Sequence, residues 1–158
     1  MIYVYPADKY GCGYYRLIWP AKALIAQGHN VVIKMPDARD GIGGDVNRVT
    51  GEVVGARVPE DAEAVVLQRV SMSQLGAAIP LLRKQGVAVI VDMDDDLSRI
   101  PPENPAFWNL RKDTGHAQHN WDNAAKACMA ATLVTVSTPR LLQVYATHGR
   151  GVVLENCV

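Results

Sequence analysis

Four aspartates crowd the end of one apolar run. In VAVIVDMDDDL, residues 87–97, the run ends in Asp92, Asp94, Asp95 and Asp96. Carboxylates this close repel one another unless a cation, a basic side chain, backbone donors or water offsets their charge. The cluster therefore suits metal ligands, hydrogen-bond acceptors for a substrate, or a solvated capping turn. Asp94 and Asp96 form a DxD pair that could bind Mg²⁺ or Mn²⁺, but strand alternation would point Asp95 away from Asp92 and Asp94.

A pair of glycines precedes the first expected helix, in GCGYYR. Gly11 and Gly13 permit positive φ and close backbone approach, and the free amides of a first helical turn attract phosphate or carboxylate. Arg16 can add a charge-assisted hydrogen bond to such a ligand. Because Arg16 stands where GxGxxG has its third glycine, and Lys34 where an acidic residue is expected, a nicotinamide site is disfavoured. An anion or acceptor site and a tight turn without ligand both remain open.

Two further groups of polar residues are candidates for catalysis or ligand binding. His116 and His119 in GHAQHNW would share a helix face, as half of a metal site or as a general base, but no third ligand lies nearby and a surface or capping role is favoured.

In VSTP, Ser137 or Thr138 is expected to cap a helix, with its hydroxyl at the same edge as the aspartates. Arg69, after a neighbouring strand, is the natural counter-charge for the aspartate cluster.

The elements that must position these residues alternate along the chain. Short apolar runs predict strands, and helical spacing of apolar residues with Gly or Pro punctuation predicts the helices between them. The strands are expected at residues 1–5, 30–35, 62–70, 87–93, 132–137 and 151–158, with a short edge strand near 52–58, and the helices at 14–28, 71–86, 121–131 and 138–149. Ser71 or Ser73 is expected to cap the second helix, and Pro80 to kink it or make its first half irregular.

This alternation predicts an α/β fold, an open doubly wound parallel sheet of the Rossmann-like type. Continuously apolar strands such as VAVIV fit a sheet covered by helices on both faces. Ligands of such sheets bind at the carboxyl ends of the strands. The glycine loop, Gln68 with Arg69, the aspartate cluster and VSTP all fall at that edge.

Composition narrows the classes of function. The chain has 158 residues, about one domain, with 16 basic and 16 acidic residues, so its formal charge is zero and clustered phosphate contacts are not indicated. The composition therefore disfavours a nucleic-acid partner. Three cysteines without CxxC spacing indicate neither a disulfide framework nor a zinc knuckle. No basic, apolar signal begins the chain and no apolar run approaches the roughly 18 residues of a membrane span, so a cytoplasmic protein is expected.

Taken together, the motifs resemble the amino-terminal half of a glycosyltransferase of the GT-B fold, and most closely the glycosyltransferases encoded by bacteriophages of actinobacteria. The resemblance rests on GCGYYRLIWPAKALIAQGHNVVI, VVLQR, VIVDMDDDL, VTVSTPRLLQVYA and VVLENCV and covers nearly the whole chain. It implies that residues 1–158 form a single Rossmann-like acceptor-side domain. A carboxy-terminal donor-binding domain, absent from this chain, would be its partner, and the host cell's cytoplasm its location.

The resemblance also implies an activity. The complete enzyme would transfer a sugar, as a hexosyltransferase does, from a nucleotide-sugar co-substrate to a hydroxyl-bearing acceptor of unknown type, and this domain alone would be inactive. Such enzymes generally need no DxD metal, so neither a metal nor another cofactor is expected. The candidate catalytic residues are Asp94, Asp95 and His119, with His116 as a competitor for the base. The candidate substrate-binding residues are Gly11, Gly13, Tyr14, Arg16, Arg69, Asp92, Asp96, Ser137 and Thr138.

The competing function is a non-catalytic α/β module that binds a nucleotide or a phosphate. A receiver-type domain would need an acidic pair directly after the first strand, where this chain has YPADKYG.

Overall fold

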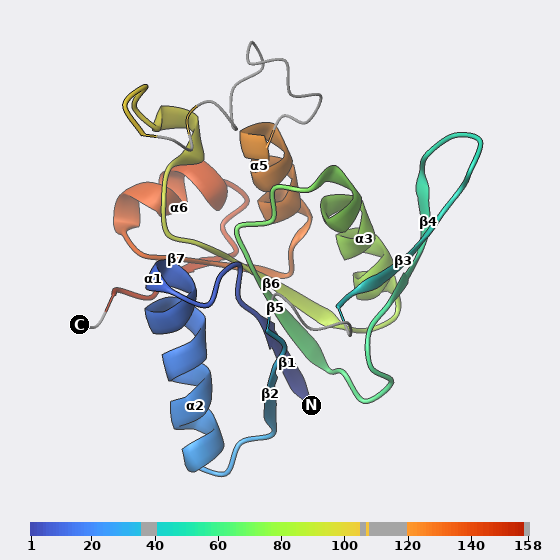
Figure 1. The fold of residues 1–158 in the computed structure, drawn as a ribbon, viewed down its shortest axis with the longest axis horizontal. Helices are drawn as coiled ribbons and strands as arrows, with labels where there is room; N and C mark the ends of the chain where they lie inside the picture. The colour runs from blue at the N-terminus through green and yellow to red at the C-terminus, as the bar shows by residue number, and fades with distance from the viewer. Residues whose placement is uncertain (36–40, 105–106, 108–119, 157–158) are drawn as a thin grey trace.

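The computed structural model describes residues 1–35, 41–104, 107 and 120–156. Within them the chain forms a six-stranded, wholly parallel sheet in the order β2-β1-β5-β6-β7-β8 (Figure 1). The strands are β1 (Ile2–Tyr5), β2 (Val31–Ile33), β5 (Ala64–Gln68), β6 (Ala88–Met93), β7 (Leu133–Val136) and β8 (Gly151–Val153). All six were predicted, and the α/β, doubly wound, Rossmann-like fold is confirmed.

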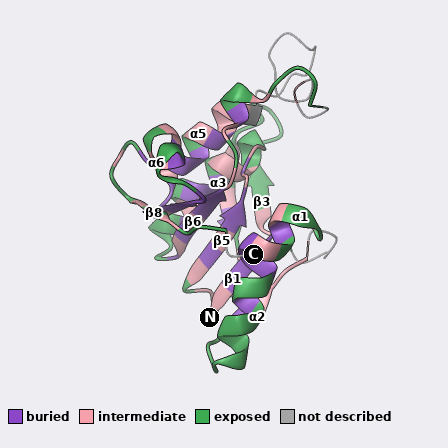
Figure 2. Cartoon of the chain, turned by 90° about the vertical axis from the view of Figure 1, so that its left-hand side faces the viewer, coloured by how far each residue is buried: buried purple, intermediate pink, exposed green. Residues whose placement is uncertain are grey.

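Helices cover both faces of the sheet. Gly11 begins a helical stretch made of α1 (Gly11–Gly13), the π-helix η1 (Tyr14–Ile18) and α2 (Trp19–Ala26), and it packs Leu17 and Ala21 against Val4 and Val31. The other face carries α3 (Ser73–Lys84), α5 (Asn120–Ala130) and α6 (Pro139–Tyr145) over the larger core (Figure 1). The sheet between them is the most buried part of the molecule (Figure 2).

The first helix departs from regular α geometry just before Pro20. The Trp19 amide donates to the Tyr14 carbonyl, one residue further back than in an α-helix. Pro20 follows and has no backbone N–H to donate. The irregular turn therefore lies where the proline would interrupt the regular hydrogen bonds of an α-helix in any case.

The expected cap of α3 is wrong. Met72, not Ser71 or Ser73, occupies the N-cap position, and it makes no side-chain capping bond. Pro80 lies inside this helix, and the first turn before it is regular, with the Gly76 amide donating to the Met72 carbonyl at 3.0 Å, so the first half of α3 is not irregular.

The segment between β2 and β5 forms a separate antiparallel hairpin of β3 (Gly43–Val46) and β4 (Val53–Arg57). The strand expected near residues 52–58 exists as β4, but it pairs with β3 and not with the edge of the main sheet. Ala56 is buried in the core, and the Gln85 side chain of the α3 C-terminus donates to its carbonyl at 2.9 Å. The hairpin therefore packs over α3.

A 3₁₀ turn, η2 (Leu97–Arg99), follows β6 and the aspartate cluster. In the part of the chain that the structure describes, no helix is both long and apolar enough to cross a membrane.

Candidate functional site

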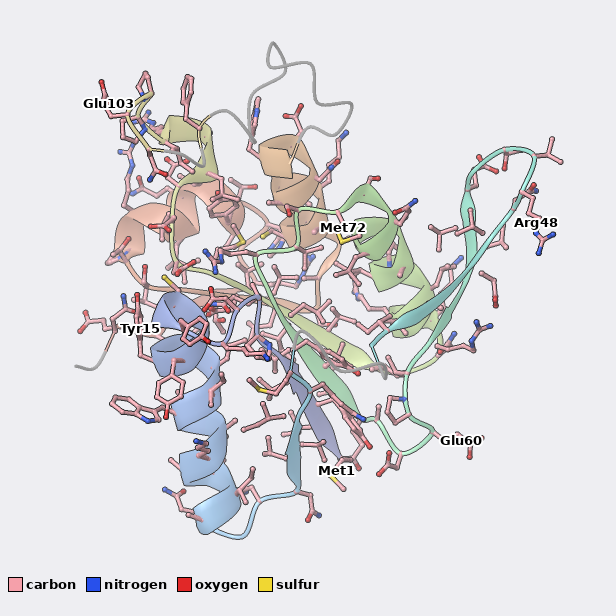
Figure 3. The ribbon with its side chains drawn as sticks, in the orientation of Figure 1. Met1, Tyr15, Arg48, Glu60, Met72 and Glu103 are labelled. Atoms are coloured by element: carbon pink, nitrogen blue, oxygen red, sulfur yellow. The ribbon has the colours of Figure 1, made fainter. Side chains whose placement is uncertain are left out.

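The candidate site lies at the carboxyl edge of the sheet, where the ends of β1, β5 and β6 meet the start of the first helix. The Gln68 Cα pairs with Asp92 across β5 and β6, and Tyr5 pairs with Leu67 across β1 and β5. Figure 3 shows the side chains around this edge, with Tyr15 labelled on the first helix. The strand order reverses between β1 and β5, which is where open α/β sheets commonly bind ligands.

Asp94 is the central side chain of this site. It is 3% exposed, and neither carboxylate oxygen accepts a hydrogen bond from any described residue. Among the described residues, Arg69 forms an ion pair with it: the Arg69 Nε lies 3.8 Å from Asp94 Oδ1 and has no hydrogen-bond partner there. The backbone at Asp94 is held by Ser137, whose hydroxyl donates to the Asp94 carbonyl at 3.0 Å. A buried charged group without hydrogen bonds costs at least about 1–3 kcal/mol, so its persistence favours a ligand.

Arg69 adopts a strained backbone conformation. Its φ of 48° makes it the one non-glycine residue with positive φ among those described. Such a conformation costs on the order of 1–3 kcal/mol and is typical of functional sites. The Arg69 amide donates to the Asp92 carbonyl at 2.9 Å, and its guanidinium forms an ion pair with Asp8. Arg69 therefore lies beside the aspartate cluster, 3.8 Å from Asp94, while Asp8 is its closer partner.

Gln68, like Arg69, has a buried side-chain donor without a hydrogen-bond partner among the described residues. Its side-chain oxygen accepts from the Ala7 amide at 3.0 Å, while its Nε2 is buried and has no partner among the described residues. Adjacent strand ends thus offer one carboxylate, on Asp94, and two donors, on Gln68 and Arg69.

Cys12, Asp95 and Tyr15 complete the site. One ligating atom each of Cys12, Asp94 and Asp95 lie within 4.8 Å of one another, and the Tyr15 hydroxyl is 3.2 Å from Cys12 Sγ. Burial, followed by the charge of Asp94, raises the pKa of the Asp95 carboxyl, although Arg69 opposes this shift. Burial and then Asp94 likewise raise the pKa of the Cys12 thiol.

The glycine loop is capped by the protein's own carboxylate. Asp8 Oδ1 accepts from the Gly13 amide at 3.2 Å and from the Tyr10 amide at 3.0 Å. Gly11 has a φ of 46°, and a Cβ on Gly13 would overlap the Asp8 backbone and lie 2.8 Å from its Oδ1. The backbone conformation therefore favours glycine at position 11, and the close approach of Asp8 requires it at position 13. The Gly13 amide, which was expected to face a ligand, already donates to Asp8.

Arg16 and Asp92, both predicted to bind substrate, form a buried ion pair instead. Arg16 Nη2 and Nε donate to Asp92 at 2.5 and 3.1 Å, and Thr135 Oγ1 donates to the same carboxylate at 2.6 Å. Arg16 Nη1 donates to the Leu154 carbonyl and to Asn156 Oδ1. These contacts tie the first helix to β6, β7 and the segment after β8, and leave Asp92 only 1% exposed.

The remaining predicted residues have local roles or lie elsewhere. Asp96 caps η2, accepting from the Ser98 amide at 3.2 Å and its hydroxyl at 2.6 Å, which turns it away from a DxD arrangement with Asp94. Thr138 caps α6, as predicted. Tyr14 is 37% exposed and packs its ring 5.4 Å from that of Trp19. His116 and His119 lie outside the described residues.

Sequence reasoning did not select Asp8, Cys12 or Tyr15 as site residues. Asp8 could have been found as an acidic residue just before a helix start, where carboxylates commonly cap amides. Cys12 and Tyr15 carry no comparable signal, because only the fold brings them next to Asp94 and Asp95.

Comparisons with protein-family models, with curated proteins and with solved structures found no match for this chain.

Proposed function

We propose that this chain is the acceptor-binding domain of a GT-B-type glycosyltransferase, which moves a sugar from a nucleotide-sugar to an acceptor hydroxyl. The Rossmann-like fold and the sequence motifs at its carboxyl edge support the proposal. The observation that carries it is Asp94, a buried carboxylate whose two oxygens lack hydrogen-bond donors among the described residues.

The unused groups around Asp94 suit a hydroxylated ligand. A hydroxyl both donates and accepts hydrogen bonds, so it can donate to Asp94 and accept from Gln68 Nε2 or Arg69 Nε. These three groups belong to adjacent strand ends and are unpartnered in the described part of the chain. A sugar or another polyol presents several hydroxyls at once and could satisfy all three.

In the proposed reaction, Asp94 or Asp95 accepts the proton of the acceptor hydroxyl. As that proton leaves, the oxygen bonds to the anomeric carbon of the donor sugar, and the bond from that carbon to the nucleotide's phosphate oxygen breaks with its electron pair. A base works best when its pKa is near the working pH, and the raised pKa of Asp95 moves it in that direction. Asp94 is the better placed for binding because it is the more buried.

A module that only binds phosphate fits the site less well. A phosphate near Asp94 would face Asp8 and Asp95 as well, and Arg69, which lies beside Asp94, is already paired with Asp8. The Gly13 amide, expected to bind an anion, is used by Asp8. The charge of the site therefore favours a neutral acceptor.

The partners proposed with this function follow from the resemblance. A second, donor-binding domain would hold the nucleotide-sugar as co-substrate, and the reaction would take place in the cytoplasm of a bacterial host cell. The zero formal charge disfavours a nucleic-acid acceptor.

Backbone-amide NMR of the chain, titrated with simple glycosides and separately with inorganic phosphate and nucleoside diphosphates, tests the proposal. We expect glycosides to shift the resonances of Gln68, Arg69 and Asp94, and Asp94→Asn to abolish this response while Asp96→Asn preserves it. Phosphate binding at the glycine loop with no response to any glycoside would favour the phosphate-binding module.

A cellular assay tests transfer itself. Mass spectrometry of cell extracts should show acceptors heavier by one sugar residue when the protein is expressed with its donor-binding domain. Loss of a general base typically lowers a rate by about 100-fold or more, so Asp94→Asn or Asp95→Asn should nearly remove that product. Unchanged product with both variants would rule out the aspartates as the base.

A further inference from the structure

A thiol and two carboxylates converge at the edge of the sheet. Cys12 comes from the first helical turn, and Asp94 and Asp95 from the segment after β6. One ligating atom of each lies within 4.8 Å of the other two. We propose that Cys12, Asp94 and Asp95 bind a divalent transition-metal ion of the zinc type.

The environment of Asp94 is the independent observation that points to a ligand. Its side chain is 97% buried (3% exposed), and it is aimed into the group without a hydrogen bond to either oxygen from the described residues. Buried carboxylates are normally hydrogen-bonded or bound to a metal. A cation between Asp94, Asp95 and Cys12 would satisfy this carboxylate, which Arg69 at 3.8 Å does not.

The donor set selects the kind of metal. Mg²⁺ and Ca²⁺ prefer oxygen ligands alone, whereas Zn²⁺ takes thiolate and carboxylate together. With Zn–S and Zn–O bonds of about 2.3 and 2.1 Å, a tetrahedral site separates its ligand atoms by about 3.5 Å. The observed separations of at most 4.8 Å need only small side-chain rotations to reach that value.

Three protein ligands leave the fourth tetrahedral position open. That arrangement is typical of zinc sites that bind water or substrate, in contrast to closed structural sites with four protein ligands. The Tyr15 hydroxyl, 3.2 Å from Cys12 Sγ, can hydrogen-bond the thiolate and orient it.

The local charge permits a dication. Two carboxylates and a thiolate carry three negative charges, and the nearby Arg69 is directed mainly at Asp8. Zn²⁺ would leave one negative charge for Arg69 to face. Asp96 is no part of this site because it caps η2, so the ligands are not the DxD pair visible in the sequence.

This inference does not depend on the proposed function, because metal binding can be measured without donor or acceptor. If both hold, the open position is where an acceptor hydroxyl would bind, and the ion would lower the pKa of that hydroxyl.

Cobalt titration of the metal-free chain tests the site directly. Co²⁺ replaces Zn²⁺ and reports a thiolate ligand through a near-ultraviolet charge-transfer band. We expect that band to saturate at one equivalent and to be displaced by Zn²⁺. Cys12→Ser should abolish the band, and Asp94→Asn should weaken Co²⁺ binding by at least about tenfold, since even indirect ligand contacts are worth 10–100-fold.

Matched variants keep this test decisive. Cys128→Ser, Cys157→Ser and Asp96→Asn should retain the band, and near-ultraviolet circular dichroism should confirm that each variant is folded. No band at millimolar Co²⁺, or a band that survives Cys12→Ser, would overturn the proposal. Glycoside binding without metal binding would leave the proposed function standing and remove only the metal site.

Discussion

At the scale of single residues, two aspartates two positions apart have opposite environments. Asp92 receives hydrogen bonds from Arg16 and Thr135, whereas Asp94 receives none from the described residues. Both side chains are almost fully buried. The difference separates a carboxylate that holds the fold together from one that remains available to a ligand, and it makes opposite predictions for substitution.

Asp92→Asn should destabilise the protein by about 3–5 kcal/mol, because it leaves the buried Arg16 guanidinium without its counter-charge. Urea denaturation followed by circular dichroism measures the change. The double variant Arg16→Met with Asp92→Leu should recover much of that loss, since replacing both charges leaves neither unpaired. Equal losses in the single and double variants would contradict this account of the pair.

Asp94→Asn should leave the free energy of unfolding of the metal-free protein unchanged or raise it by about 1 kcal/mol. The substitution removes a buried charge that no described residue hydrogen-bonds and relieves its repulsion with Asp95. In the same urea assay, Asp96→Ala should be destabilising by about 1 kcal/mol, because it removes the side-chain cap of η2. A large loss with Asp94→Asn would mean that the carboxylate has a structural role.

At the scale of elements, the junction between β1 and the first helix depends on Gly13. Gly13→Ala should destabilise the protein by at least about 1–3 kcal/mol, because the added Cβ would overlap the Asp8 backbone and crowd its carboxylate, 2.8 Å away. Gly41→Ala is the control, since no atom of the described residues lies within 4 Å of a Cβ there. Thermal unfolding of both variants measures the difference, and equal melting temperatures would show that the junction adapts.

The strands of the main sheet could be predicted because buried parallel strands are continuous apolar runs. β3 could not, because GGDV has little β propensity and is specified by its pairing with β4. The edge on which the site lies could also be predicted, from the alternation of strands and helices. The pairing of Arg16 with Asp92 could not be predicted, because it joins residues 76 positions apart through side-chain orientations that the sequence pattern does not contain.

At the scale of the whole molecule, the sheet order places the site where two halves of the fold diverge. β1 continues to β2 on one side, while β5 through β8 extend on the other, so loops from both halves reach one edge. Asp8 and Cys12 come from the first half, and Arg69, Asp94 and Asp95 from the second. Ligand binding at this edge would therefore join the two halves, and the Arg69–Asp8 ion pair already does so without a ligand.

Stability of the whole molecule should fall in alkaline solution. Burial, with a smaller effect of Asp92, raises the pKa of Cys128 to about 12 from an ordinary value of 9.0. A hydrogen bond with Cys12, followed by burial, raises the pKa of Tyr15 to about 12, and burial raises that of Tyr145. The folded protein thus keeps protons that the unfolded chain releases, so the free energy of unfolding decreases as pH rises through this range.

Cys128→Ala isolates one of these contributions. While only the unfolded chain titrates, each such group lowers the free energy of unfolding by about 1.4 kcal/mol per pH unit. Urea denaturation at several values between about pH 8 and pH 11 should therefore give a shallower decline for the variant than for the unsubstituted protein, because the two share every other titrating group. The variant starts from a lower stability, owing to the cavity it leaves in α5, so the slopes and not the absolute values are compared. Parallel slopes would show that the Cys128 thiol titrates alike in the folded and unfolded states, despite being fully buried in the core.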